Sequence, residues 1–231
     1  MDDRDLMGIR ADTLFRYNAH GRMLHSNEPE GRPAPWLFLG RTMSGQVVRF
    51  SEAVPDALAT RLAAIIECQA TVGALPVPPA ARDAVREALE ERAPITEEKG
   101  GPAYRFPESV ARPGEVVHLT DANIDVARHT YPWLYQDLAG WGPCFAVVRD
   151  GAAVSVCFSS RIGVDAAEAG VETLPDFRGR GYAVAVTAAW GASVRAAGRI
   201  PFYSTTWENL ASQAVARRVG LVMFGADATW A

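Results

Sequence analysis

A short turn rich in arginine and glycine lies in the carboxy-terminal half of the chain. Residues 171–174 have the apolar, β-branched character of a strand, and Pro175 removes a backbone donor and ends it. Arg178-Gly179-Arg180-Gly181 follows, ahead of an alanine- and valine-rich helix predicted over residues 182–197. A strand, a glycine turn and a helix in this order expose backbone N–H groups at the positive end of a helix. This pattern favours binding of a phosphate or pyrophosphate.

The turn resembles the Arg/Gln-x-x-Gly-x-Gly/Ala signature of the GNAT acetyltransferase superfamily through Arg178, Gly181 and Ala183. Asp176-Phe177 is similar to the acidic-aromatic pair that precedes this signature. The resemblance implies that the loop holds the pyrophosphate of acetyl-CoA, through Arg178, Gly179, Arg180, Gly181, Tyr182 and Ala183. The alternative is an arginine-glycine surface turn that caps a helix. A dinucleotide-binding fold is disfavoured because no G-x-G-x-x-G occurs.

A second element downstream resembles the same family. Asn209-x-x-Ser212 opens a predicted helix that ends at Gly220-Leu221. The resemblance implies that Asn209 bonds the pantetheine arm and that Ser212 faces the thiol, although Asn209 also suits a simple N-cap. Many members place a tyrosine where this chain has Ala216. Ser212, Tyr203 or a water would then protonate the departing thiolate, or the thiolate leaves unassisted.

An amine attacks a thioester only when neutral, so a base must remove a proton from a group whose pKa is about 10.4. Glu172 and Glu168 are the carboxylates next to the strand before the loop. Glu172 is the base if its face opens to the acceptor, and a plain surface carboxylate if it meets solvent. Glu208 and Asp176 are alternatives. A backbone N–H near Thr173 or Leu174 would polarise the thioester carbonyl.

Aromatic residues cluster between positions 131 and 141, where the family places acceptor contacts. Trp133 and Tyr135, together with Trp207, are candidates for lining an amine pocket. Core packing explains the same residues equally well.

Composition sets bounds on function. The chain has 231 residues, 48% hydrophobic and 22% charged, with a net charge of −4. This balance disfavours nucleic acid and membrane surfaces as partners and mildly favours a cationic amine. The three cysteines and four histidines lack metal-ligand spacing, so no metal is expected. The sequence shows neither a signal peptide nor a membrane span, which predicts a cytoplasmic protein. It leaves a homodimer open.

Periodicity predicts an α+β (mixed α/β) fold, and the resemblance implies a GNAT fold with a splayed mixed sheet flanked by helices over residues 104–231. We expect an α/β region of unassigned role at 1–100 and an acetyl-CoA-binding catalytic domain at 101–231, with residues 96–102 as the linker. Helices are predicted at 6–17, 55–71, 80–92, 121–130, 182–197 and 210–219. Strands are predicted at 36–40, 46–50, 144–148, 153–158, 171–174, 201–206 and 221–224, with two more inside 104–119 around a turn at 112–114. The turns Ser44-Gly45 and Asp150-Gly151 predict that the first two strands form one hairpin and the next two another. Residues 165–169 are a connection of undefined form.

The sequence therefore predicts transfer of an acetyl group from acetyl-CoA to a primary amine, by direct transfer in a ternary complex. The acceptor is expected to be a small molecule, and a protein or peptide is the alternative. The missing tyrosine at Ala216 also favours a second hypothesis, a GNAT-fold sensor that binds acyl-CoA without catalysis. Transfer of another acyl group remains open.

Overall fold

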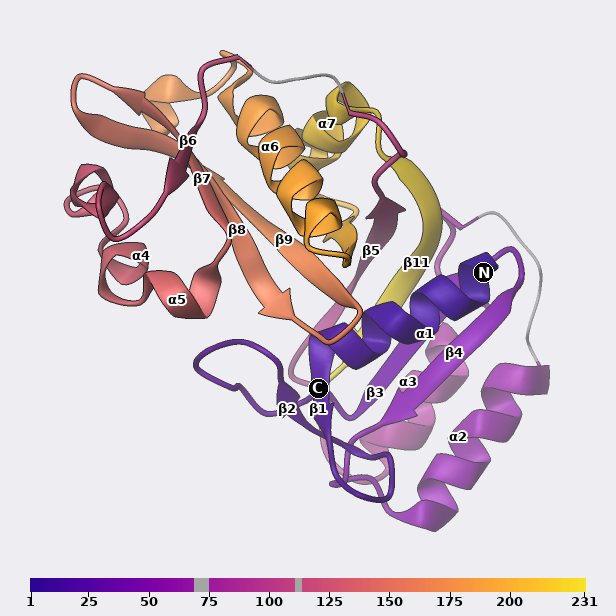
Figure 1. The fold of residues 1–231 in the computed structure, drawn as a ribbon. Helices are drawn as coiled ribbons and strands as arrows, with labels where there is room; N and C mark the ends of the chain where they lie inside the picture. Colours follow the sequence, from indigo (N-terminus) through magenta and orange to yellow (C-terminus); the bar gives the residue numbers. More distant parts are fainter. Residues whose placement is uncertain (69–74, 111–113) are drawn as a thin grey trace. The chain divides into compact units, whose positions relative to one another are not determined.

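The computed structural model describes residues 1–68, 75–110 and 114–231. The chain divides into two compact units (Figure 1). Unit 1 comprises residues 1–103, 205–209 and 223–231, and unit 2 comprises residues 104–204 and 210–222. The carboxy-terminal sequence thus contributes to both units, which a single boundary near residue 100 does not express.

Unit 1 is built on a sheet with the strand order β4-β3-β11-β5. Its elements are α1 (Asp3–Leu14), β1 (Phe15–Tyr17), β2 (Met23–Ser26), β3 (Leu37–Thr42), β4 (Gly45–Phe50), α2 (Asp56–Cys68), α3 (Arg82–Glu90), β5 (Glu98–Arg105) and β11 (Val222–Trp230). The predicted hairpin is confirmed, because β3 pairs with β4 in antiparallel register.

The core of unit 1 forms where α2 and α3 pack on this sheet. Leu62 and Ile66 of α2 and Leu89 of α3 are buried against Leu37 of β3 and Trp230 of β11. Burial of these large apolar side chains supplies the main favourable term in folding. The helix at 55–71 is confirmed as far as Cys68, and residues 69–71 lie outside the described residues.

Unit 2 carries a mixed sheet with the order β10-β9-β8-β7-β6. Its elements are β6 (Val117–Leu119), η1 (Ile124–Ala127), α4 (Pro132–Gln136), α5 (Leu138–Trp141), β7 (Cys144–Arg149), β8 (Ala152–Ile162), β9 (Ala166–Thr173), η2 (Pro175–Phe177), α6 (Tyr182–Ala196), β10 (Ile200–Ser204) and α7 (Leu210–Val219). β10 runs parallel to β9, and the other pairs are antiparallel.

Helices cover both faces of the unit 2 sheet (Figure 1). On one face, the Trp190 indole N–H of α6 donates to Ser159 Oγ of β8 at 3.1 Å. On the other face, the adjacent Phe158 packs edge-to-face with Trp133 of α4 and Trp141 of α5. Because neighbouring residues of a strand point to opposite faces, β8 separates these two layers.

The strongest local predictions in unit 2 hold. β7 and β8 form the expected hairpin, with Asp150 at φ 50° and Gly151 at φ 78° in its two-residue turn. The helices expected at 182–197 and 210–219 appear as α6 and α7. Cys144 and Cys157 are buried, and burial raises the pKa of the Cys144 thiol to about 12.

The expected linker at 96–102 is wrong, because residues 98–102 lie in strand β5. Glycines made this stretch look like a loop, yet they are needed inside the sheet. A Cβ built on Gly101 would lie 1.8 Å from the Thr205 carbonyl oxygen, and one on Gly100 would lie 2.8 Å from that of Asp227. Close backbone approach, rather than chain flexibility, explains these glycines.

Three other boundaries are corrected. The first helix ends at Leu14, and Phe15–Tyr17 forms β1 paired with β2 instead of continuing the helix to residue 17. Only the 3₁₀ turn Ile124–Ala127 forms within 121–130. Residues 166–169 of the segment 165–169 belong to β9, which extends the predicted strand in the amino-terminal direction. The turn predicted at 112–114 falls largely on residues 111–113, which lie outside the described residues.

Candidate active site

The arginine-glycine turn forms an open loop before α6. The 3₁₀ turn Pro175–Phe177 follows β9, and Gly179 and Gly181 adopt φ values of 76° and 84°. A residue with a Cβ is strained in this left-handed region, which explains why glycine occupies both positions. Gly181 is the N-cap of α6 and provides no side-chain cap.

The backbone N–H groups of this loop are available to a ligand. The first bond inside α6 runs from the Ala185 N–H to the Gly181 carbonyl at 3.1 Å. Within the described chain, the N–H groups from Gly179 to Val184 have no acceptor. Free N–H groups at the start of a helix of this length form an anion site.

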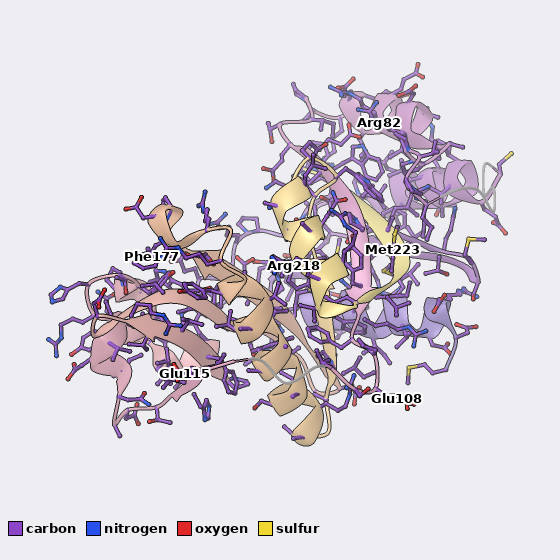
Figure 2. All side chains as sticks on the ribbon, turned by 90° about the horizontal axis from the view of Figure 1, so that it is seen from above. Arg82, Glu108, Glu115, Phe177, Arg218 and Met223 are labelled. Atoms are coloured by element: carbon purple, nitrogen blue, oxygen red, sulfur yellow. The ribbon has the colours of Figure 1, made fainter. Side chains whose placement is uncertain are left out.

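Arginine side chains surround the loop, and their donors reach neutral acceptors. Arg178 Nε donates to the Thr173 carbonyl at 3.2 Å, and Arg180 Nη2 donates to the Asp176 carbonyl at 3.0 Å. Nη2 of Arg218, from α7, would lie 3.3 Å from a Cβ built on Gly181. Figure 2 marks Arg218 on its helix and Phe177 in the turn ahead of α6.

Tyr182 lies next to positively charged arginine side chains at the start of α6. Arg149 Nε donates to its hydroxyl at 3.3 Å, and the Arg149 guanidinium lies over its ring at 5.0 Å. The hydrogen bond from Arg149 lowers the pKa of Tyr182, with a smaller contribution from Arg180. In the part of the chain that is described, Arg149, Arg178, Arg180 and Arg218 form no ion pair with a carboxylate.

β9 and β10 pair only at one end. Their parallel register covers Ala166 to Glu168 of β9 and Ile200 to Phe202 of β10. β9 continues to Thr173 alongside β8, while its opposite edge has no β10 partner beyond Glu168 among the described residues. The sheet therefore splays where β9 leads into the arginine-glycine loop.

The register of β9 shows which backbone groups face this open edge. The Leu174 N–H donates to the Val154 carbonyl at 3.0 Å, so it is already satisfied. Because bonding alternates along an antiparallel pair, Thr173 directs its backbone groups away from β8. The bond from Arg178 Nε to the Thr173 carbonyl agrees with this direction. Of the two N–H groups considered for the thioester carbonyl, that of Thr173 is the one left available.

Glu172 lies on the face of the sheet that carries the aromatic side chains. It is directly opposite Val156, two positions from the pair formed by Phe158 and Gly170, so these residues share one face. Its side chain is exposed, yet partial desolvation raises the pKa of the Glu172 carboxyl above its ordinary value. The Tyr131 hydroxyl approaches the Glu172 carbonyl oxygen at 3.5 Å.

The candidate acceptor residues differ in their surroundings. Trp133 is partly buried and packs against Trp141 and Phe158, with ring centroids 5.0 and 4.7 Å away. Tyr135 instead stacks under the Arg128 guanidinium at 4.5 Å. Core packing therefore accounts for most of the Trp133 ring.

Tyr203 and Ser212 meet on the α6 and α7 side of the sheet. The Tyr203 hydroxyl and Ser212 Oγ are 2.6 Å apart. Burial raises the pKa of Tyr203 to about 12, and the hydrogen bond with Ser212 acts in the opposite direction. Ala216, on the same helix as Ser212, is fully buried.

Residues 134–225 match the family model described as GNAT acetyltransferase. This part of the chain belongs to that family. The resemblance proposed from the Arg178-to-Ala183 and Asn209-to-Ser212 motifs is thereby confirmed.

Solved structures support the GNAT fold. An acetyltransferase from the GNAT family of Colwellia psychrerythraea matches with 14% identity and a TM-score of 0.50, over 80% of this chain and 75% of that chain. A Drosophila protein matches with 16% identity and a TM-score of 0.51, over 84% and 73%. A GNAT-family putative acetyltransferase of Novosphingobium aromaticivorans has 18% identity and a TM-score of 0.46, over 59% of this chain and 65% of that chain. At these identities the two matches with TM-scores of 0.50 and 0.51 show the fold alone. No functionally curated protein gives a significant match.

Two predicted residues of the GNAT region belong to unit 1. The Trp207 N–H donates to the Gly100 carbonyl at 3.2 Å, and the Asn209 N–H donates to the Thr206 carbonyl at 3.3 Å. The loop residues, Glu172, Ser212, Trp133 and Tyr135 belong to unit 2.

Sequence reasoning missed Arg149 and Arg218 beside the GNAT loop. Arg149 ends β7 just before the hairpin turn, and Arg218 lies in the last turn of α7. A basic residue at a helix carboxy-terminus has a routine explanation in the helix dipole, so nothing in its sequence position indicated a ligand contact.

The alternative base Glu168 is enclosed at the point where β9 and β10 separate. Its side chain is buried, and Ser204 Oγ donates to its Oε1 at 2.5 Å.

No group of histidine, cysteine, aspartate or glutamate suited to a metal occurs within residues 1–68, 75–110 and 114–231. Across the same described ranges, no helix has the length and apolar character needed to cross a membrane.

Proposed function

We propose that the protein transfers an acetyl group from acetyl-CoA to a primary amine of a small molecule. The observation that carries this proposal is the loop of Gly179 to Val184. It combines free N–H groups at the start of α6 with arginines that have no carboxylate partner. A pyrophosphate needs both several donors and uncompensated positive charge.

The residues present fit such a co-substrate. Positive φ at Gly179 and Gly181 lets the backbone approach phosphate oxygens without a Cβ between them. Next to the loop, the open edge of β9 offers backbone groups to an extended amide chain, as an added strand would use them. We assign the pantetheine arm to this edge.

Glu172 is the proposed base. The raised pKa of its carboxyl lies closer to the pKa of the ammonium group whose proton it must accept. Glu172 also shares a face of the sheet with the aromatic residues of α4 and α5. Trp133 and Tyr135 are the proposed acceptor contacts from that side. As the amine adds to the thioester, the Thr173 N–H donates to the carbonyl oxygen that gains negative charge.

Departure of the thiolate depends little on a strong acid. A thiol has a pKa of about 8.5, far below that of a buried phenol. Since the pKa of Tyr203 is raised to about 12, Tyr203 keeps its proton and orients Ser212. Ser212 Oγ then donates a hydrogen bond to the sulfur, and solvent supplies the proton.

The first experiment is calorimetric titration with acetyl-CoA. Arg180→Glu/Gly181→Asp places negative charge in the loop and should abolish binding. The matched control is Gly198→Asp/Arg199→Glu at the other end of α6, where Gly198 also has positive φ, 78°, and open space around it. Equal loss in both variants would mean a folding defect and would remove support for the loop.

Turnover is measured as release of CoA thiol across a panel of primary amines. Release that requires both an amine and Glu172 supports the transferase. Tight acetyl-CoA binding without release for small amines or amino-terminal peptides would instead support the acyl-CoA sensor that Ala216 suggests.

A further inference from the structure

Unit 1 contains a depression of about 440 Å³ that has no part in the proposed transfer reaction. It lies between α1, the β1–β2 turn and β4, and its polar and aromatic lining includes Asp12, Tyr17, His20, Arg22, Arg49 and Phe50. This volume is in the range of small-molecule sites, about 300 to 1,000 Å³.

Arg22 lines this depression and carries an unsatisfied donor. Its Nη2 pairs with the exposed carboxylate of Asp56, and its guanidinium lies 5.6 Å from the centre of the Phe50 ring. Its Nη1 is buried and, within the described chain, has no hydrogen-bond partner. A buried N–H without an acceptor is costly, so the arrangement favours an acceptor that reaches this guanidinium after a side-chain rotation.

Arg49 provides a second guanidinium in the same wall. Its Nη1 donates to the Val48 carbonyl at 3.2 Å, and its Nη2 lies 3.5 Å from Asp12 Oδ1. These contacts use only part of the five donors that a guanidinium carries. The Tyr17 hydroxyl donates to the Ala11 carbonyl at 3.0 Å. Because burial raises its pKa well above the ordinary value, this phenol stays neutral.

The charges in the lining suit one negative charge. Two arginines, Arg22 and Arg49, and one carboxylate, Asp12, line the depression. Asp56 pairs with Arg22 from outside this lining, and because its side chain is 95% exposed, solvent screens its charge. A monoanion therefore balances the charge of the lining, while a dianion meets Asp12 with excess charge. Arginine binds a planar carboxylate through parallel hydrogen bonds. The Phe50 ring beside Arg22 offers an apolar surface to the rest of such a molecule.

We propose that this depression, the unit 1 pocket, binds a small organic carboxylate with an aromatic or aliphatic body. The carboxylate bridges Arg22 and Arg49, and the body rests near Phe50. The proposal is independent of acetyl transfer.

The test is nuclear magnetic resonance titration of the full-length protein with phenylacetate. Phenylacetamide is the neutral probe of the same shape, and inorganic phosphate is the anion without an apolar body. Phenylacetate should give saturable shifts centred on residues 17–22 and 48–50, at a concentration at least tenfold below that needed for either other probe. Shifts elsewhere, or equal affinity for phenylacetamide or phosphate, would overturn the proposal.

Variants localise the effect. Arg22→Met and Arg49→Met should each weaken phenylacetate binding at least tenfold, whereas Arg16→Met should not, because Arg16 is not among the residues that line the depression. Asp12→Asn should tighten binding several-fold by removing the competing carboxylate. If Asp12→Asn instead weakens binding, or Arg16→Met weakens it as much as Arg22→Met, the charge assignment is wrong.

Discussion

The GNAT loop and the unit 1 pocket both gather arginines, but they arrange them differently. In the loop, Arg178 and Arg180 donate to backbone carbonyls, and free N–H groups add to their charge. In the pocket, Arg22 pairs with Asp56, and Arg49 lies beside Asp12. Uncompensated arginines beside a helix start suit a multiply charged pyrophosphate, while partly neutralised ones suit a single carboxylate.

The largest expected effect separates binding from chemistry. Glu172→Gln should lower kcat/KM for the amine by about 10²- to 10⁴-fold. Because the carboxyl pKa is raised by desolvation, activity of the unsubstituted protein should fall at acid pH along a limb displaced above that of an ordinary glutamate, and the variant should lack this limb.

The affinities for acetyl-CoA and phenylacetate show whether Glu172→Gln changes binding as well as turnover. Acetyl-CoA binding by calorimetry and phenylacetate binding should both stay unchanged, as they should in Asp176→Asn. If Glu172→Gln turns over at the normal rate, the base is elsewhere, and Glu168 becomes the next candidate.

Charge reversals should act on one region at a time. Arg218→Glu is expected to weaken acetyl-CoA binding about 10- to 100-fold, since loss of a charge-assisted contact costs about 1.5 to 3 kcal/mol. Arg22→Glu should leave acetyl-CoA binding unchanged and abolish that of phenylacetate. Calorimetry on both variants with both ligands measures this, and loss of both ligands in either variant would contradict the distinction.

Buried phenols should make both regions sensitive to alkali. The folded pKa of Tyr203 is about 12 against an ordinary 10.0, so its stabilising contribution is complete below pH 10 and is lost as the pH rises to about 12. A two-unit difference corresponds to about 2 to 3 kcal/mol.

Urea unfolding between pH 9 and 12 measures this loss. Tyr203→Phe and Tyr17→Phe should each flatten the pH dependence. A dependence that persists unchanged in Tyr203→Phe would assign the alkaline loss to other groups.

The smallest expected effect is that of salt on the affinities for the two ligands. Raising ionic strength from about 0.05 to 0.5 M should weaken acetyl-CoA binding about tenfold, because exposed charges are screened over roughly 10 Å at 0.1 M. Phenylacetate, with one charge, should lose only about two- to threefold. An equal dependence of both affinities on ionic strength would contradict the proposed difference in charge between the two regions.

Local sequence determined much of unit 2. Asp150-Gly151 required a tight turn, Gly179 and Gly181 occupy positive φ, and the apolar runs of α6 and α7 fixed both helices. These features depend on neighbours in the chain, so the motif, the fold and the family followed from them.

Tertiary structure decided what sequence spacing could not. Gly100 and Gly101 looked like a linker and proved to be strand residues, because Asp227 of β11 and Thr205 approach their backbone. Only the pairing of β9 with β8 showed which face carries Glu172 and that the Leu174 N–H is engaged. Arg149 and Arg218 reach the loop from other elements, and Arg22 meets Arg49 from a distant strand. The sequence by itself determined the loop, while the surroundings of each candidate group depend on contacts between residues far apart in the chain.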